Sequence, residues 1–403
     1  GRFSVTMPII FVVVGLIFGP KGLVSAKSAE LLTEMTLALL LFADASTLDF
    51  RQVRDDARLP GRLLLIAMPL IIALGGVVAY GLFPGEGLGF ALLLAAILAP
   101  TDAALGLPIF NNPRVPVRIR RALNVESGLN DGIATPLVAL FTAMALAYET
   151  QQTGGWLLSA LGEISIGVGA GVAAGLLGGW LFAAAVKRGW TSATGEQIGN
   201  LALALFAFWA AKALGGNGFV AAFVGGILFG HVTRERLHLA TEFTETSGTL
   251  LSLFVWAVFG ANLVPPLLES FTPLALLYAL LSLTVIRMIP VAISLIGARL
   301  RPDTTLIMGW FGPRGLASVV FALMAYEAFH EAGRNSDLLA DTAAWAVLLS
   351  VVLHGISAVP LANWYARRLE TADPAAPELV AVPELGVRRK DPLDWLKHRQ
   401  QEA

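Results

Sequence analysis

Residues Leu98–Asp131, LAPTDAALGLPIFNNPRVPVRIRRALNVESGLND, place helix-breaking and charged residues between stretches that are otherwise apolar. A Pro-Thr-Asp sequence at 100–102 interrupts one apolar segment, and four polar residues lie on the next one. They are Glu126, Ser127, Asn130 and Asp131. Carboxylates inside membrane spans are energetically expensive and usually mark ion pathways or proton relays. If these segments cross a membrane, the stretch indicates a functional site within it.

The composition of the whole chain indicates an integral membrane protein. Its 403 residues are 56% hydrophobic and only 14% charged, and the mean hydropathy is +0.71, whereas soluble domains carry about 25% charged residues. A soluble enzyme is therefore excluded. The net charge of -1 gives no basis for a nucleic-acid partner. Since the chain has no cysteine, disulfides and cysteine-based metal sites are excluded as well.

Twelve apolar segments are candidates for membrane spans, because a helix needs about 20 apolar residues to cross the hydrocarbon core. They lie near residues 3–19, 29–46, 62–83, 88–110, 122–148, 156–186, 196–214, 217–231, 242–262, 272–299, 304–327 and 342–366. Every second connection is rich in Arg and Lys, which stay on the cytoplasmic side. We therefore expect a transmembrane domain at 1–372 with both ends cytoplasmic, and a polar cytoplasmic tail at 373–403.

Two of these segments contain helix breaks in corresponding places of the two halves. The fourth is interrupted at 99–102 and the eleventh at 309–315, where proline and glycine weaken a helix. The eleventh segment comes seven positions after the fourth, and this odd offset means that the two broken helices run in opposite directions, as in an inverted repeat. We expect repeats at about 1–150 and 194–370, joined by a linker helix at 155–188. Because the first half is one span short, we expect a thirteenth helix before Gly1.

The polar residues after the first break fall on two stripes of a helix. Residues four apart lie on nearly the same face, so Ser127, Asp131 and Thr135 form an oxygen-rich stripe suited to a hard monovalent cation or a proton. Glu126 and Asn130 form a second stripe, rotated by about 100°. No cationic residue lies within one helical turn of Asp131, so we expect this carboxylate to bind the ion.

Charged residues elsewhere in the apolar segments need partners. A lone buried guanidinium is prohibitively costly, so we pair Arg287 with Glu126 as a structural ion pair and assign Arg314 to charge compensation at the second break. We expect Asp102 to accept hydrogen bonds from N–H groups freed at the first break and to offset the positive end of the following half-helix.

Three further residues are candidates with open roles. Thr101 can offer a hydroxyl and a backbone carbonyl to an ion. Asp44 either reaches the site or is a helix-end residue at the interface, and the sequence favours neither. His354 lies in the middle of the twelfth segment, where a hydrogen-bonded packing histidine is favoured over a proton relay.

The break at Thr101-Asp102, the Glu126–Asp131 segment and the break at 312–315 together resemble the cation:proton antiporters, specifically the NhaP/NHE branch with an Asn-Asp pair. The likeness extends from about Thr6 to Arg368. The resemblance implies a homodimer in which each protomer has a dimerisation domain and a six-helix core domain, at about 62–148 and 272–370, that moves as a unit.

The resemblance also implies residue roles. Asp131 would be the carboxylate shared by cation and proton, with Thr101, Ser127 and an acid at the position of Asp44 as further ligands. Glu126 and Arg287 match the intramembrane ion pair of the family. Two positions differ: Ala103 stands where the family often has proline, and Asp44 where many members carry glutamate.

These features predict a secondary transporter that exchanges a monovalent cation, with sodium expected, for a proton by alternating access. Because Asn130 adds no second titratable group, the exchange should be electroneutral and one for one. Potassium or lithium in place of sodium, and a sodium-coupled symporter for an organic anion, remain alternatives. A channel and an intramembrane enzyme fit less well, because the inverted plan suits alternating access and the sequence lacks an HExxH segment, an evident Ser-His pair and cysteine. We expect no cofactor, and a place in the inner cell membrane.

Overall fold

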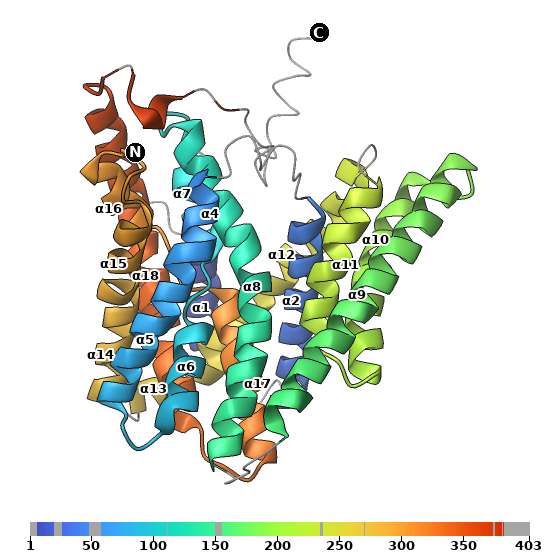
Figure 1. Ribbon diagram of the computed structural model, residues 1–403, viewed down its shortest axis with the longest axis horizontal. Coiled ribbons are helices and arrows are strands. Elements are labelled where there is room, and N and C mark those ends of the chain that lie inside the picture. The colour runs from blue at the N-terminus through green and yellow to red at the C-terminus, as the bar shows by residue number, and fades with distance from the viewer. Residues whose placement is uncertain are drawn as a thin grey trace.

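The structure is a computed structural model that describes residues 6–19, 26–47, 58–110, 112–149, 155–233, 237–269, 271–373, 375–380 and 382. Every regular element within these residues is a helix (Figure 1). Most of the predicted tail, and any segment before Gly1, lie outside the described residues.

The helices fall on all twelve predicted apolar segments, although several segments contain more than one helix. Those of the first half are α1 (Met7–Phe18), α2 (Ala26–Ser46), α4 (Arg58–Arg62), the π-helical η1 (Leu63–Ala67), α5 (Met68–Leu82), α6 (Gly87–Ile97), α7 (Ala103–Phe110), α8 (Val117–Glu149) and α9 (Trp156–Lys187). Those of the second half are α10 (Ala193–Ala213), α11 (Gly218–Thr233), α12 (Leu237–Val258), the π-helical η2 (Phe259–Leu263), α13 (Val264–Glu269), α14 (Pro273–Leu283), α15 (Val285–Ser294), α16 (Pro302–Trp310), α17 (Leu316–Glu331), α18 (Asp337–Leu369) and the short 3-10 helix η3 (Pro377–Leu379).

Six helical stretches among the described residues are long and apolar enough to cross a membrane. They are Arg58–Leu82, Val117–Tyr148, Trp156–Lys187, Thr241–Glu269, Pro273–Ser294 and Asp337–Leu369. Met7–Phe18, Gly87–Ile97 and Gly218–Thr233 are apolar but shorter. The expectation of an all-helical integral membrane protein is confirmed. The count of twelve spans and the thirteenth helix stay predictions, partly because the breaks divide two predicted spans into short pieces.

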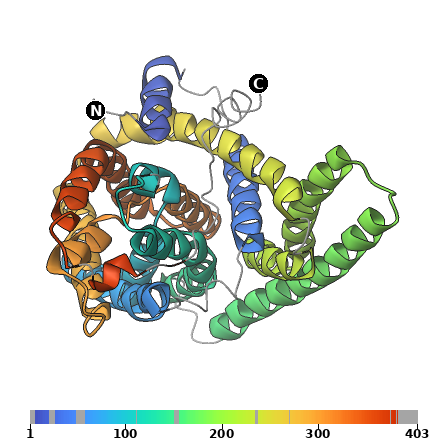
Figure 2. The same cartoon turned by 90° about the horizontal axis from the view of Figure 1, so that it is seen from above.

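The helices form two groups when the molecule is viewed from above (Figure 2). One group contains α5–α8 and α14–α18, and the other contains α2 and α9–α11, with α12 extending from the second group toward the first. Helices α9 and α11 pack closely because α9 presents a row of glycines to its neighbour. These are Gly167, Gly171, Gly175 and Gly179, where a Cβ atom would lie only 2.5–3.1 Å from α11 or from Asn217, which precedes it.

Both predicted helix breaks are present, and they meet. The first separates Ile97, the end of α6, from Ala103, the start of α7, and the second separates Trp310 from Leu316. The backbone N–H of Asp102 donates to the carbonyl of Pro313 at 2.8 Å, so the two unwound segments lie side by side.

A third discontinuity, at Thr284 between α14 and α15, divides the predicted segment 272–299, whose helix also ends at Ser294 rather than at 299. Thr284 has φ -112° and ψ -95°, outside the helical region. The interruption leaves carbonyl groups at the end of α14 that can accept hydrogen bonds from side chains.

Candidate functional site

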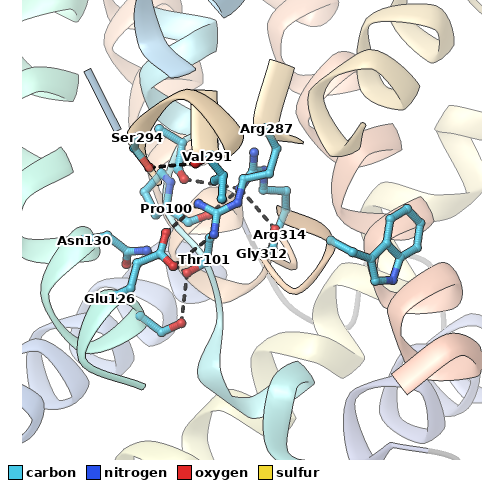
Figure 3. Close-up of polar contacts among 12 residues, drawn as sticks. Pro100, Thr101, Glu126, Asn130, Arg287, Val291, Ser294, Gly312 and Arg314 are labelled. Atoms are coloured by element: carbon cyan, nitrogen blue, oxygen red, sulfur yellow. Dashed lines mark hydrogen bonds and ion pairs between the residues drawn. The ribbon is translucent and has the colours of Figure 1, made fainter. Parts of the chain in front are cut away.

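The first break and helix α8 bring three buried polar side chains together. The Thr101 and Ser127 hydroxyls are 2.9 Å apart, and the side-chain amide of Asn130 donates to the Thr101 hydroxyl at 2.7 Å. Each of the three residues is at most 5% exposed. The hydroxyl of Thr101 is therefore the centre of this Thr101–Ser127–Asn130 cluster, which Figure 3 shows in part.

The cluster has acceptor capacity left over. A side-chain amide oxygen offers two lone pairs, and the buried Oδ1 atom of Asn130 accepts no hydrogen bond from the described residues. Two hydroxyl oxygens and one amide oxygen are hard neutral ligands of the kind that alkali and alkaline-earth cations take. The cluster can therefore supply neutral oxygen ligands to a cation. The negative charge that balances a bound cation must come from a carboxylate outside the cluster.

Asp131 is the carboxylate residue that directly follows Asn130 of this cluster on α8. Its side chain is half-buried, and Gly132 packs directly against the ring of Phe223 on α11. The Thr135 hydroxyl donates to the backbone carbonyl of Asp131 at 2.8 Å, so it is engaged by the helix itself. Ser127 and Asn130, which periodicity assigns to different stripes, thus both bond to Thr101, and the face shared by Ser127, Asp131 and Thr135 stays a prediction.

Asp44 is half-buried in the last turn of α2, a helix that packs against α8. Its backbone carbonyl accepts a hydrogen bond from the Thr47 hydroxyl at 2.9 Å. This position is close to the end of the helix at Ser46 and on an element that contacts the helix of Asp131. This position is compatible both with a role as an ion ligand and with a role as a helix-end residue.

Glu126 and Arg287 form a two-bond ion pair between α8 and α15 (Figure 3). The Nη1–Oε1 and Nη2–Oε2 distances are 2.5 and 3.0 Å, and the two side chains are only 3% and 2% exposed. Gly312 of the second break lies against this guanidinium, where a Cβ atom would be 2.6 Å from Cζ and 2.9 Å from Nη2. The pair therefore joins α8 to the second break as well as to α15.

Arg314 is fully buried and donates to backbone carbonyls at the ends of three helices. Its Nη1 atom lies 3.3 Å from the Ala99 carbonyl, 3.4 Å from that of Pro100 and 3.1 Å from that of Gly312. Its Nη2 atom is 3.1 Å from the carbonyl of Ser282, near the end of α14. The guanidinium of Arg314 thus lies where the C-terminal ends of α6, α14 and α16 concentrate negative partial charge.

Asp102 caps a helix of the opposite break. Its carboxylate accepts a hydrogen bond from the N–H of Leu316, the first residue of α17, at 3.1 Å. We expected it to offset α7, the half-helix that follows it in sequence. The structure places it at α17 because the two unwound segments run side by side, and because Gly315 has no Cβ to displace the carboxylate.

Sequence reasoning did not identify two serines that also serve the breaks. The Ser318 hydroxyl donates to the Ile97 carbonyl at the end of α6 at 2.8 Å. The Ser350 hydroxyl accepts from the backbone N–H of Arg314 at 2.6 Å. Both are buried serines within apolar helices, which is the signal that could have found them.

Comparison with known proteins identifies relatives. The family model described as "Sodium/hydrogen exchanger, transmembrane" matches residues 1–364. The K(+)/H(+) antiporter NhaP of Alkalimonas amylolytica is 25% identical over 388 residues, which are 94% of this chain and 65% of that relative. The probable Na(+)/H(+) antiporter 2 of Methanocaldococcus jannaschii is 25% identical over 395 residues, covering 87% of each chain. The chain thus spans less than two thirds of the length of the first of these relatives.

A solved structure has the same fold. The structure of the sodium proton antiporter MjNhaP1 from Methanocaldococcus jannaschii at pH 8 superposes with a TM-score of 0.71 and 20% sequence identity, and the alignment covers 89% of this chain and 92% of that one. The likeness places the crossed breaks in a known helical architecture. Together with the family match over residues 1–364, it shows that this chain belongs to the sodium/hydrogen exchanger family.

Proposed function

We propose that this protein is a secondary transporter that exchanges a monovalent cation for protons across a membrane by alternating access. The observation that carries the proposal is the buried Thr101–Ser127–Asn130 cluster at the crossed breaks, which Asp131 follows directly in the sequence of α8. The family supports the same reaction class.

Competition at one carboxylate provides the mechanism. A carboxylate in a partly desolvated site can hold either a proton or a cation that finds oxygen ligands around it. We assign the cation to Asp131, Ser127 and Thr101, with Asn130 positioning Thr101 and Asp102 holding the crossing together. Since Asn130 is uncharged, one proton and one monovalent cation neutralise the site equally, and the exchange is electroneutral.

Sodium is the cation we propose first, and potassium is the second candidate. The names of the relatives favour both, because the M. jannaschii protein is named a probable Na(+)/H(+) antiporter and the A. amylolytica protein a K(+)/H(+) antiporter. Size selection depends on small differences in ligand distances, so the experiment must compare the ions directly.

We also propose the architecture that this function requires. It has twelve spans in this chain and a thirteenth before residue 1, with both ends of the chain on the cytoplasmic side of the inner membrane. The helices at about 62–148 and 272–370 form the moving core, and the remaining helices form the dimerisation domain of a homodimer. The two helix groups in Figure 2 support this division.

The test is exchange in proteoliposomes that carry a pH-sensitive dye. Sodium, potassium and lithium are added in turn to vesicles with an acidic lumen, with and without a clamped membrane potential. We expect alkalinisation by sodium that does not respond to the potential. Asp131→Asn should abolish this exchange in folded protein, and retained cation-dependent flux in that variant would refute the site. A response to an organic anion with sodium, and to no cation alone, would support symport instead.

A further inference from the structure

We propose that His354 and Ser350 of α18 are positioning residues of the transport cycle, which anchor the second helix break to α18 beside the ion site. The proposal rests on the exchange function proposed above. It starts from two backbone groups, the Trp310 carbonyl and the Arg314 N–H. In a continuous helix these two groups would bond to each other, and here each has a partner on α18.

In an α-helix the N–H of each residue bonds to the carbonyl four residues earlier. Arg314 would thus bond to Trp310 if α16 continued. Instead, the Arg314 N–H donates to the Ser350 hydroxyl at 2.6 Å, and the Trp310 carbonyl lies 2.9 Å from Nε2 of His354. Ser350 and His354 are four residues apart, so they lie on one face of α18. This face provides a partner for both backbone groups that the break separates, although the Trp310 carbonyl also accepts from the Gly312 N–H at 2.8 Å.

The chemistry of the contact fixes the role of each histidine nitrogen. A carbonyl can only accept a hydrogen bond, so Nε2 carries the hydrogen that points at Trp310. Nδ1 lies 3.2 Å from the Ser350 hydroxyl and 3.0 Å from the Ser350 carbonyl. Because a neutral ring offers only a lone pair at Nδ1, the hydroxyl is its partner. The hydroxyl can then accept from Arg314 and donate to His354, which satisfies every group in the chain of bonds.

Packing holds this arrangement in one geometry. His354 and Ser350 are fully buried, and the imidazole is stacked on the Trp310 ring with a centroid distance of 5.0 Å. The Trp310 indole N–H donates to the Ser357 hydroxyl, one turn further along α18, at 2.9 Å. The last residue of α16 is therefore tied to α18 through its backbone, its ring face and its indole nitrogen.

The held segment leads directly to the ion site. Arg314 donates to the Ala99 and Pro100 carbonyls, and Asp102 donates its N–H to Pro313. Thr101 lies between Pro100 and Asp102 and is the centre of the hydroxyl cluster. Without these two contacts, the unwound segment would lose its anchors to α18 and could shift away from Thr101. We therefore expect the pair to control cation affinity more than the maximal rate.

The transport test compares two replacements of the histidine. His354→Gln keeps an N–H donor that can reach the Trp310 carbonyl, whereas His354→Met fills the space without one. We expect the methionine variant to raise the apparent KM for the cation about two- to tenfold, the effect of losing one buried hydrogen bond, because the Trp310 carbonyl keeps only its bond from the Gly312 N–H at 2.8 Å. The glutamine variant should restore most of the affinity. Thr342→Val is the matched control, because Thr342 is buried on the same helix and its hydroxyl bonds only within α18.

A second readout does not depend on transport. Ser350→Ala removes the acceptor of the Arg314 N–H, so amide hydrogen exchange in a peptide covering 311–318 should accelerate, while Thr342→Val leaves it unchanged. If the wild-type protein transports no cation, the proposed function is refuted. The amide hydrogen-exchange measurement still tests whether Ser350 holds the second break in place. Equal KM values for His354→Met and His354→Gln, or unchanged hydrogen exchange in Ser350→Ala, would overturn the proposal.

Discussion

Removing the carboxylate of Glu126 tests the electrostatic reasoning most directly. In Glu126→Gln the Arg287 guanidinium stays buried, with its side chain 2% exposed, but loses its only anionic contact among the ion pairs described. A second guanidinium, that of Arg314, interacts electrostatically with both members of the pair. The change therefore leaves two buried cations without the carboxylate that serves them.

The expected loss is large. Breaking a buried ion pair by removing one partner costs about 3–5 kcal/mol, because the remaining charge is uncompensated. With an unfolding entropy of about 2.1 cal/mol/K for each residue, this loss lowers the melting temperature by about 4–6 °C. Replacing both partners, as in Glu126→Leu with Arg287→Met, removes the charges together and should recover most of that loss.

The measurement is thermal unfolding of purified protein in detergent, monitored by tryptophan fluorescence. The matched control is Thr342→Val, which removes a buried polar group distant from the breaks in sequence. A melting temperature in Glu126→Gln within about 1 °C of the wild type would refute the reasoning, since it would mean that the pair is not desolvated. An equal loss in the single and double variants would refute it too, because shape rather than charge would then be responsible.

Two further perturbations act near the second break. Gly312→Ala would place a Cβ atom 2.6 Å from Cζ of Arg287, so we expect a loss of about 1–3 kcal/mol in melting experiments, whereas Gly81→Ala, in open space, is the neutral control. Asp303 lies in the first turn of α16, outside the six long spans, and hydrogen bonds from Arg301 hold the pKa of its carboxyl below the ordinary value of 3.8. Because this pKa is lowered by folding, the pair stabilises the protein above pH 4 and less as the pH falls through the lowered pKa. Asp303→Asn should therefore melt below the wild type at pH 6, and the difference should shrink in acid.

The helix breaks could be predicted because their causes are local. Proline lacks an N–H and clashes with the preceding turn, and Pro100 and Pro313 each lie inside an interruption. The ion pair could be predicted for a different reason, which is that a buried charge requires a partner. Glu126 and Arg287 were candidates for each other because both lie deep within apolar segments. The interruption at Thr284 contains neither proline nor glycine, and nothing in the local sequence indicates it.

The partner of each helix cap could not be predicted, because it depends on tertiary packing. Sequence alone relates Asp102 to the half-helix that follows it, while its bond to Leu316 exists only because two unwound segments lie side by side. Thr135 shows a second limit. Periodicity places its hydroxyl on the face of Asp131, but a helical threonine can also bond to the carbonyl four residues back, and this one does.

The charges at the crossing explain how one carboxylate can set the charge of the whole site. Arg314 and Arg287 contribute two positive charges, and Asp102 and Glu126 contribute two negative ones, so the four cancel within the two breaks. In the mechanism that we propose, Asp131 adds one negative charge to this balanced site. A proton or a monovalent cation removes that charge equally, and burial in a membrane strongly favours the neutral site over the empty one. In the same proposed mechanism, a core that crosses the bilayer only when neutral carries one ion in each direction, and this requirement would give one-for-one exchange.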